Sequence, residues 1–175
     1  IAISAESDDL KLRTDDGNIL FALAENSEKM RLNINGNLGL GTTIPSATSG
    51  SSYKQFFVNT GGALVDSGGS GPATMLLNNS YIGSGNNNYA TVTQKASRIT
   101  MTSGRIDFAT VGSVSADAQQ TFTERMRITD GGNVGIGDSA PIAKLQVTTA
   151  NSGVSPHALA DELFIENSGD SNTAV

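Results

Sequence analysis

The sequence predicts an all-β protein that is built from serial modules. Three observations predict it: apolar and polar residues alternate in short runs, small turn-forming pairs separate the runs, and one phrase occurs twice. Alternation with a period of two is typical of strands that bury one face, and pairs such as Asn-Gly and Asp-Gly favour tight hairpin turns. Apolar residues at helical spacing are nearly absent. We therefore expect strands and hairpins throughout.

The repeated phrase begins at Glu28 and again at Glu124. Glu-Lys-Met-Arg-Leu is matched by Glu-Arg-Met-Arg-Ile 96 residues later, and a glycine-spaced run, a proline and an alanine follow in both copies. Nine of twenty aligned positions are identical, and the alignment needs no insertion. Such a repeat predicts structural units stacked in series. Each copy should form a strand, a tight turn and a second strand, which ends at Pro45 or Pro141 because proline lacks a backbone donor.

Large and small residues alternate along the second strand of each copy. We expect Leu38 and Leu40, like Val134 and Ile136, to point to one face of the strand. The opposite face should carry glycines only, namely Gly39, Gly41, Gly135 and Gly137. Glycine on one strand face indicates that another backbone approaches closely. In a trimer this approach could take place at the shared axis.

The remaining elements follow from the same alternation and turn signals. We expect a hairpin at 11–21 that turns near Gly17, a hairpin at 99–108 that turns near Gly104, and a loop at 81–89 that joins strands. Further strands are expected at 53–58, 63–65, 144–148 and 162–167. The resulting organisation is a first module at 1–47, a Ser/Gly-rich connector at 48–71, a second module at 72–147, a linker at 148–160 and the start of a third module at 161–175.

Composition excludes several classes of site and partner. The chain has no cysteine, so it can form neither disulfides nor thiolate metal sites. Its formal net charge of −6 disfavours nucleic acid and anionic membranes, and no apolar run is long enough to span a bilayer. We expect no nucleic-acid partner and no membrane insertion. Because the chain begins and ends inside predicted strands, we expect it to be an internal piece of a longer polypeptide.

The charged residues of the repeat, Glu28 with Arg31 and Glu124 with Arg127, are three positions apart. On a regular strand such positions face opposite sides, so a glutamate should not easily reach its own arginine. A glutamate of a neighbouring chain could pair with the arginine instead and help to fix the register of a trimer. The alternative is two independent surface charges.

Motifs that could carry cofactor or metal chemistry are weak. Residues 135–140 spell G-x-G-x-x-A, but Pro141 follows and no helix pattern begins there, as a dinucleotide site requires. The single histidine, His157, lies in the linker, where exposure to solvent is the simplest explanation; three copies could instead meet around a metal in a trimer. The 15–18 turn could hold calcium, although EF-hand spacing is absent. We therefore predict no cofactor and no metal.

Catalysis and sugar binding also have candidate residues. The acidic pairs at 8–9, 15–16 and 161–162 are of the type that glycan-cleaving enzymes use, but all three occur at turns or strand starts, where aspartate is a common turn residue. Five aromatic residues could form a sugar platform, although packing inside the chain and between chains explains them more simply: Tyr53, Phe56, Phe57, Tyr81 and Tyr89. We predict no enzymatic activity.

Taken together, the repeated residues resemble a known family. The run at 123–128, the glycine-spaced run at 132–137, then Pro141 and the Ala-Lys-Leu at 143–145, closely resemble a shaft module of bacteriophage tail fibres. Such modules often lie upstream of an endosialidase-type intramolecular chaperone. The first copy departs from the pattern because no Lys-Leu follows Ala47. A weaker resemblance covers 160–169, which is similar to the segment that follows the module.

The resemblance implies an elongated, parallel homotrimer of interleaved β-strands and hairpins. We would then expect a structural shaft segment in the virion, flanked by neighbouring tail proteins, that carries host-recognition parts and contributes to host attachment. The residues expected to pack the trimer are those shared by the two copies: Met30, Arg31, Gly39, Gly41, Glu124, Met126, Arg127, Gly135 and Gly137. The alternatives are a segment that itself binds host-surface glycan, a glycan-hydrolysing tailspike and a head fibre.

Overall fold

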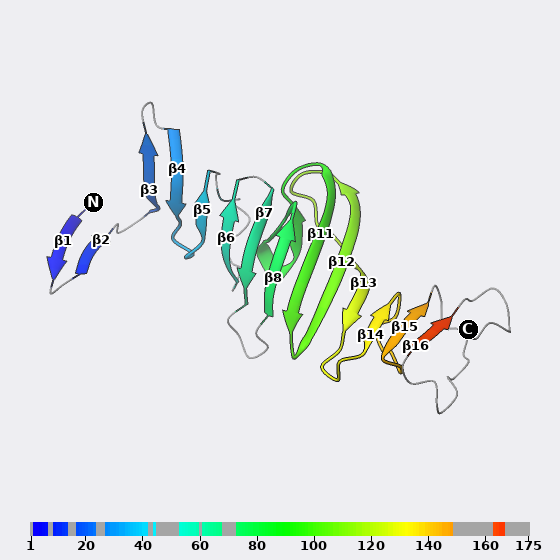
Figure 1. The fold of residues 1–175 in the computed structure, drawn as a ribbon. Coiled ribbons are helices and arrows are strands. Elements are labelled where there is room, and N and C mark those ends of the chain that lie inside the picture. The colour runs from blue at the N-terminus through cyan, green and yellow to red at the C-terminus, as the bar shows by residue number, and fades with distance from the viewer. Residues whose placement is uncertain are drawn as a thin grey trace.

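The computed structural model describes residues 17–23, 27–41, 44, 53–59, 61–67 and 73–148, and the backbone of three further strands at 2–6, 9–13 and 163–166. These residues form an all-β fold, as predicted, and contain no α-helix. Their largest sheet has twelve strands in the order β16-β15-β14-β13-β12-β11-β8-β7-β6-β5-β4-β3. The strands follow one another along the length of the chain, so the sheet is a long ribbon (Figure 1).

The strands of this sheet are short except at its centre. Their bounds are β3 (Ile19–Leu23), β4 (Ser27–Leu32), β5 (Leu38–Leu40), β6 (Lys54–Val58), β7 (Gly62–Asp66), β8 (Ala73–Asn78), β11 (Gln94–Thr102), β12 (Arg105–Val114), β13 (Thr123–Ile128), β14 (Val134–Ile136), β15 (Leu145–Thr148) and β16 (Leu163–Glu166). Neighbours are antiparallel except for β5–β6, β14–β15 and β15–β16, which are parallel. Two smaller pairs are not hydrogen-bonded into this sheet: β1 (Ala2–Glu6) with β2 (Asp9–Arg13), and β9 (Ser80–Ile82) with β10 (Asn88–Ala90).

The hairpin predicted at 99–108 is confirmed. Strands β11 and β12 pair with Thr102 opposite Arg105 and Ile99 opposite Phe108. The two turn residues, Ser103 and Gly104, have φ values of 49° and 77°. Two consecutive positive φ angles define the type I′ turn whose twist matches that of the strands.

The hairpin predicted at 11–21 is wrong. Strand β2 pairs with β1, whereas β3 pairs with β4 and forms one edge of the twelve-stranded sheet. Alternation and a glycine turn signal mark both strands correctly but do not determine which neighbour each one takes. Strand β3 has an apolar partner on its other side, since Ile19 lies opposite Leu32 and Phe21 opposite Met30.

The predicted connector at 48–71 contains two strands of the main sheet, β6 and β7, at the positions expected from the sequence. The strands expected near 144–148 and 162–167 are also confirmed as β15 and β16. Pro45, His157, the linker residues 149–160 and the acidic pairs at 8–9, 15–16 and 161–162 lie outside the residues whose side chains the structure describes.

The sheet has two unlike faces. We define the covered face as the one that carries Ala63, Val65, Met75 and Leu77, all of which are buried beneath the β9–β10 hairpin and neighbouring loops. Gln55 fixes this hairpin, because its amide donates to the carbonyl of Ile82 and accepts from the Ile82 N–H. We define the open face as the opposite one, where Leu64 and Leu76 remain 44% and 49% exposed.

Most of the aromatic residues pack inside the chain on the covered side. Tyr81 and Phe57 are buried, and Tyr53 and Tyr89 pack against the same core cluster. The rings of Tyr81 and Tyr89 are stacked with their centroids 5.7 Å apart, and the Tyr81 hydroxyl donates to Asp117 Oδ1 at 2.9 Å. Burial raises the pKa of Tyr81, and the hydrogen bond to Asp117 raises it further. The buried rings of Tyr81 and Phe57 offer no platform for a sugar, so packing explains these two residues.

Candidate functional site

The two copies of the repeat fold into the same four-stranded unit. In the first copy this unit is β3-β4-β5-β6, and in the second it is β12-β13-β14-β15. Met30 lies opposite Leu40 as Met126 lies opposite Ile136, and the last strand of each unit is added in parallel. The turns also match: Asn33 and Thr129 donate their N–H to Asn37 and Asn133, both at 2.9 Å. The repeated phrase is therefore a repeated structure.

The repeat begins one strand earlier than the alignment at Glu28 shows. Strand β3 contains Ile-Leu-Phe-Ala from Ile19, and β12 contains Ile-Asp-Phe-Ala from Ile106, in equivalent register against β4 and β13. These segments are 87 residues apart, whereas the phrases that follow are 96 apart. The second copy has nine more residues between the two strands, so an ungapped comparison misses the match. A search for Ile-x-Phe-Ala with a variable spacing would have found it.

A β-bulge interrupts the second strand of each unit at the same place. Phe21 pairs with Met30 but Ala22 pairs with Glu28, so Lys29 is an extra residue. Phe108 pairs with Met126 and Ala109 with Glu124, which leaves Arg125 in the same position. In both copies the bulge carbonyl accepts a 2.9 Å hydrogen bond, from the N–H of Gly41 or Gly137. A bulge of this kind adds one residue to one strand and increases its local twist.

The bulge contradicts the expectation that a glutamate does not easily reach the arginine of its own chain. Because one residue is extra, positions three apart come to the same face of the strand. Arg127 Nη2 lies 2.6 Å from Glu124 Oε2 in the same chain. Arg31 binds Glu28 at two points, through Nε at 2.8 Å and Nη2 at 2.6 Å. Counting with a period of two gives the wrong face wherever a bulge intervenes.

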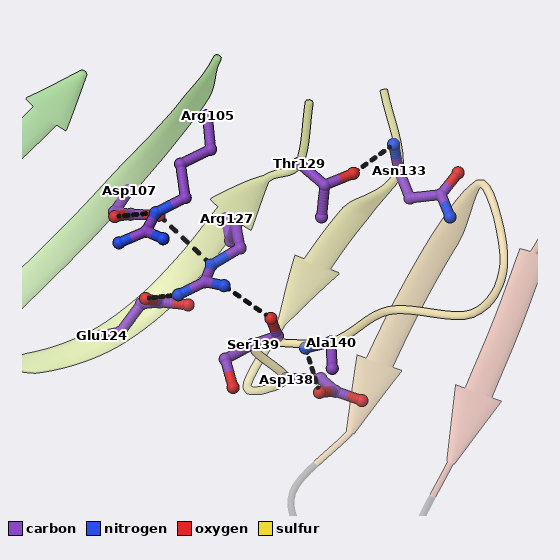
Figure 2. Close-up of polar contacts among 9 residues, drawn as sticks. All are labelled: Arg105, Asp107, Glu124, Arg127, Thr129, Asn133, Asp138, Ser139 and Ala140. Atoms are coloured by element: carbon purple, nitrogen blue, oxygen red, sulfur yellow. Dashed lines mark hydrogen bonds and ion pairs between the residues drawn. The ribbon is translucent and has the colours of Figure 1, made fainter. Parts of the chain in front are cut away.

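Arg127 joins three segments of the second unit on the covered face. Its Nε lies 3.2 Å from Asp107 Oδ1 on β12, and its Nη1 donates to the carbonyl of Ser139 at 2.7 Å. Figure 2 shows its guanidinium between Glu124, Asp107 and the loop after β14. Asp107 is buried and also accepts from Arg105 Nε at 2.9 Å. Asp107 was missed by sequence reasoning because nothing in its own strand marks it as a partner of Arg127.

The first unit lacks this aspartate. Leu20 stands opposite Arg31, where Asp107 stands opposite Arg127. Arg31 accordingly directs both of its recorded contacts to Glu28. The hydrogen bonds from Arg31 hold the pKa of the Glu28 carboxyl below its usual range, and Glu28 raises the pKa of Arg31 in return. Glu124 likewise raises the pKa of Arg127, and Asp107 adds to this effect. Both arginines thus remain cations held in place by carboxylates.

A further cation, Arg98, lies on the covered face beside the second unit. Arg98 stands opposite Ala109 in the register, and its guanidinium carbon is 4.7 Å from the centre of the Phe122 ring. Burial lowers the pKa of Arg98, while Asp107 and Glu124 oppose this shift. An aromatic face and two nearby carboxylates compensate a partly buried guanidinium. Arg98, Phe122 and the two carboxylates thus form a set of structural contacts on the covered face, and none of these side chains is a typical nucleophile.

The predicted close approach of backbone to the glycines is confirmed for Gly135 and Gly137, but the backbone comes from the same chain. Residues 137–144 connect β14 to the parallel strand β15 and pass over Gly135. A Cβ on Gly135 would overlap the carbonyl oxygen of Asp138, and one on Gly137 would overlap that of Thr148. Gly135 therefore accommodates the chain's own crossover and Gly137 the end of β15, so the backbone that approaches them is not that of a neighbouring chain at a shared axis.

Gly39 and Gly41 occupy the equivalent places in the first unit. Gly39 is buried in β5, and Gly41 follows that strand with a φ of 66°. Gly137 has the same conformation, with a φ of 77°. Both Gly41 and Gly137 lie beyond the ends of their strands and donate to the bulge, which corrects the expectation that they alternate with the leucines on a strand face. The alternation itself holds at Gly39 and Gly135.

The part of the chain that the structure describes includes the G-x-G-x-x-A motif. Residues 135–140 form strand β14 and the crossover, so no helix N-terminus is present for a pyrophosphate. Among the residues described, no three histidine, cysteine, aspartate or glutamate side chains gather as metal ligands would. Within the same residues, no helix is long and apolar enough to cross a membrane.

The open face carries the other set of repeated residues. Met30 and Met126 point to it, opposite in direction to the arginines that follow them. Tracing the paired residues from strand to strand gives one row that is apolar at every one of eleven strands. We call this the apolar row: Ile19, Leu32, Leu38, Phe56, Leu64, Leu76, Ile99, Phe108, Met126, Ile136 and Val147.

This geometry can be compared with known proteins. Neither a protein-family model nor a curated protein matches the sequence. The function proposed below is therefore based on the residues and structure of the chain itself. Two features stand out: a unit that repeats with its bulge, turn and crossover intact, and an apolar row that runs the length of the sheet.

Proposed function

We propose that the chain is a structural shaft segment of a bacteriophage tail fibre, assembled as a parallel homotrimer. In the virion it would lie between neighbouring tail proteins and hold host-recognition parts away from the particle, and so contribute to host attachment. The apolar row is the observation that carries the proposal. A side chain such as Leu76 is half exposed in a single chain, and a continuous apolar surface of this length is expected to be covered by another protein surface.

The way the chain is put together also supports a shaft. Each four-stranded unit adds its strands to the edge of the preceding part of one sheet, so length increases without a larger core. Strand β16 continues this growth beyond the second unit by pairing in parallel with β15. In the second unit Glu124 and Asp107 both pair with Arg127, and a structural role for these charges agrees with a shaft.

Two measurements on the assembled protein test this proposal. Light scattering should give the molar mass of three chains, and sedimentation should give the high frictional ratio of an elongated particle. A compact monomer would overturn the proposal. Incubation with polysaccharide from a host surface should release no sugar, and released sugar would favour a hydrolytic tailspike instead.

A further inference from the structure

The composition of the open face resembles that of a protein interface. The apolar row forms its centre, flanked on one side by Met101, Ile106, Ile128, Val134 and Leu145. On the other side of the row, at the middle of the sheet, the paired residues are polar: Asn78, Ser97, Thr110 and Thr123. Arg125, the bulge residue, lies among them and donates from Nε to Thr110 Oγ1 at 2.9 Å. An apolar centre with a polar margin is the usual anatomy of an interface.

The area of the molecule indicates how much surface is left to cover. The chain has a mass of 18.0 kDa and an accessible surface of 10790 Å². A compact monomer of this mass exposes about 8,000 Å². The larger surface reflects an elongated chain, and on the open face it includes apolar side chains such as Leu64 and Leu76, which are 44% and 49% exposed. An occasional small ligand would leave most of it exposed.

The shape of the sheet limits what can cover the row. The row runs across eleven strands that follow one another along a long, gently twisted ribbon (Figure 1). A globular partner would contact only a part of such a surface. Further copies of this chain, aligned in parallel and related by rotation about the long direction of the sheet, extend alongside it over its whole length. At each strand, the apolar row of such a copy places an apolar residue against the apolar residue of its neighbour.

Charge supports the same occupant. Each chain carries a net charge of −6, so like chains repel one another in general. Along the apolar row no position is charged, and the paired residues Lys54 and Asp66 at its margin have opposite signs. The covered face, by contrast, holds Glu28, Arg31, Glu124, Arg127 and Asp107. Contact through the open face therefore keeps the charged layer out of the interface.

We propose that the apolar row of each chain packs in register against the apolar rows of two further copies, so that the open face lies inside the assembly and the covered face lies outside. The inference rests on the proposed shaft function and adds to it the identity of the inner surface. The repeated arginine–glutamate pairs, the crossovers and the β9–β10 hairpin are then on the outer side, where solvent or another virion protein meets them.

Because the chain has no native cysteine, single cysteines report on this arrangement directly. Leu76→Cys and Val58→Cys place a thiol on the open face, in β8 and β6. Ser84→Cys is the matched control, in the exposed tip of the β9–β10 hairpin on the covered side. Each variant of the full polypeptide is first checked for molar mass and then treated with a maleimide. We expect labelling at positions 76 and 58 to be at least about tenfold slower than at 84, since labelling requires the interface to open.

The outcomes separate this inference from the proposed function. A trimer in which the thiols at 76 and 58 react as fast as that at 84 would overturn the inference and leave the shaft function standing. A monomeric parent protein would overturn both. If Leu76→Cys does not assemble while Ser84→Cys does, the inference is supported, because a side chain 49% exposed in the single chain matters for assembly only when another copy covers it.

Discussion

Arg127 and Glu124 lie on the same face of one strand although they are three residues apart, with Nη2 2.6 Å from Oε2. The bulge at Arg125 makes this possible, and the bulge at Lys29 does the same for Arg31 and Glu28. The two pairs differ in one partner. Asp107 faces Arg127 across the strands, whereas Leu20 faces Arg31. The first copy of the repeat can therefore serve as a control for substitutions in the second copy, because it has the same pair without the aspartate.

Replacement of Arg127 should cost more stability than replacement of Arg31. Arg127→Met leaves the buried carboxylate of Asp107 with Arg105 as its remaining ion-pair partner, and we expect a loss of about 3 kcal/mol in the free energy of unfolding. Arg31→Met leaves only the partly exposed Glu28, so we expect about 1 kcal/mol. Urea unfolding at one fixed protein concentration measures both values. Equal losses would show that Asp107 contributes nothing.

Stability should fall in acid in part through Glu28. Its pKa is lowered in the folded chain by the hydrogen bonds from Arg31, so the stabilisation is present above the unfolded pKa of about 4.3 and is lost as pH falls through the folded value. Urea unfolding between neutral pH and pH 3 should give a shallower acid decline for Glu28→Gln than for the parent protein. Arg31→Gln should remove the same share of the decline, because it removes the group that lowers the pKa.

The local patterns predicted most of the strands, and they failed where an interaction is not local. The hairpin at 99–108, the strand-turn-strand of each repeat and the strands β6, β7, β15 and β16 follow from alternation and turn residues. The partner of β3 could not be predicted, since alternation is the same whichever neighbour a strand takes. Alternation with a period of two places the glutamate and arginine of each copy on opposite faces, because no sequence signal marks the bulge. Asp107 and Leu20 acquire their roles only when β12 and β3 are placed in register.

Gly135 should not tolerate a side chain. Gly135→Ala would drive a Cβ into the Asp138 carbonyl of the crossover, and the backbone there can shift only by loosening the 137–144 connection. We expect a loss of about 3 kcal/mol, which is typical of a steric clash in a packed interior. Gly112→Ala is the control, because nothing lies within 4 Å of its added Cβ, and it should be neutral or slightly stabilising. Thermal unfolding followed by circular dichroism distinguishes the two.

A single substitution should stabilise the turn between β11 and β12. Ser103 has a φ of 49°, a conformation that asparagine adopts more readily than serine, and Asn-Gly is the preferred pair for a type I′ turn. Ser103→Asn should raise the free energy of unfolding by about 0.5 kcal/mol. Gly104→Ala at the next position should lower it, since φ is 77° and the Asp130 Cβ is 3.1 Å from the added methyl group. Both changes are measured by denaturant unfolding.

Deletion of one residue should be tolerated at the Arg125 bulge but not within a regularly paired stretch of the central strands. Removing Arg125 joins Glu124 directly to Met126, and in the regular strand that results Glu124 and Arg127 still share the covered face while Met126 keeps the open face. The expected cost is the hydrogen bond from Gly137 to the bulge carbonyl, about 1 kcal/mol. Removing Thr100 from β11 instead moves every residue on one side of the deletion to the opposite face, so apolar and charged layers exchange places. The first variant should unfold cooperatively with a strand-rich circular dichroism spectrum, and the second should not fold. If the two deletions were equally damaging, the bulge would be a required part of the unit and not an added residue within a regular strand.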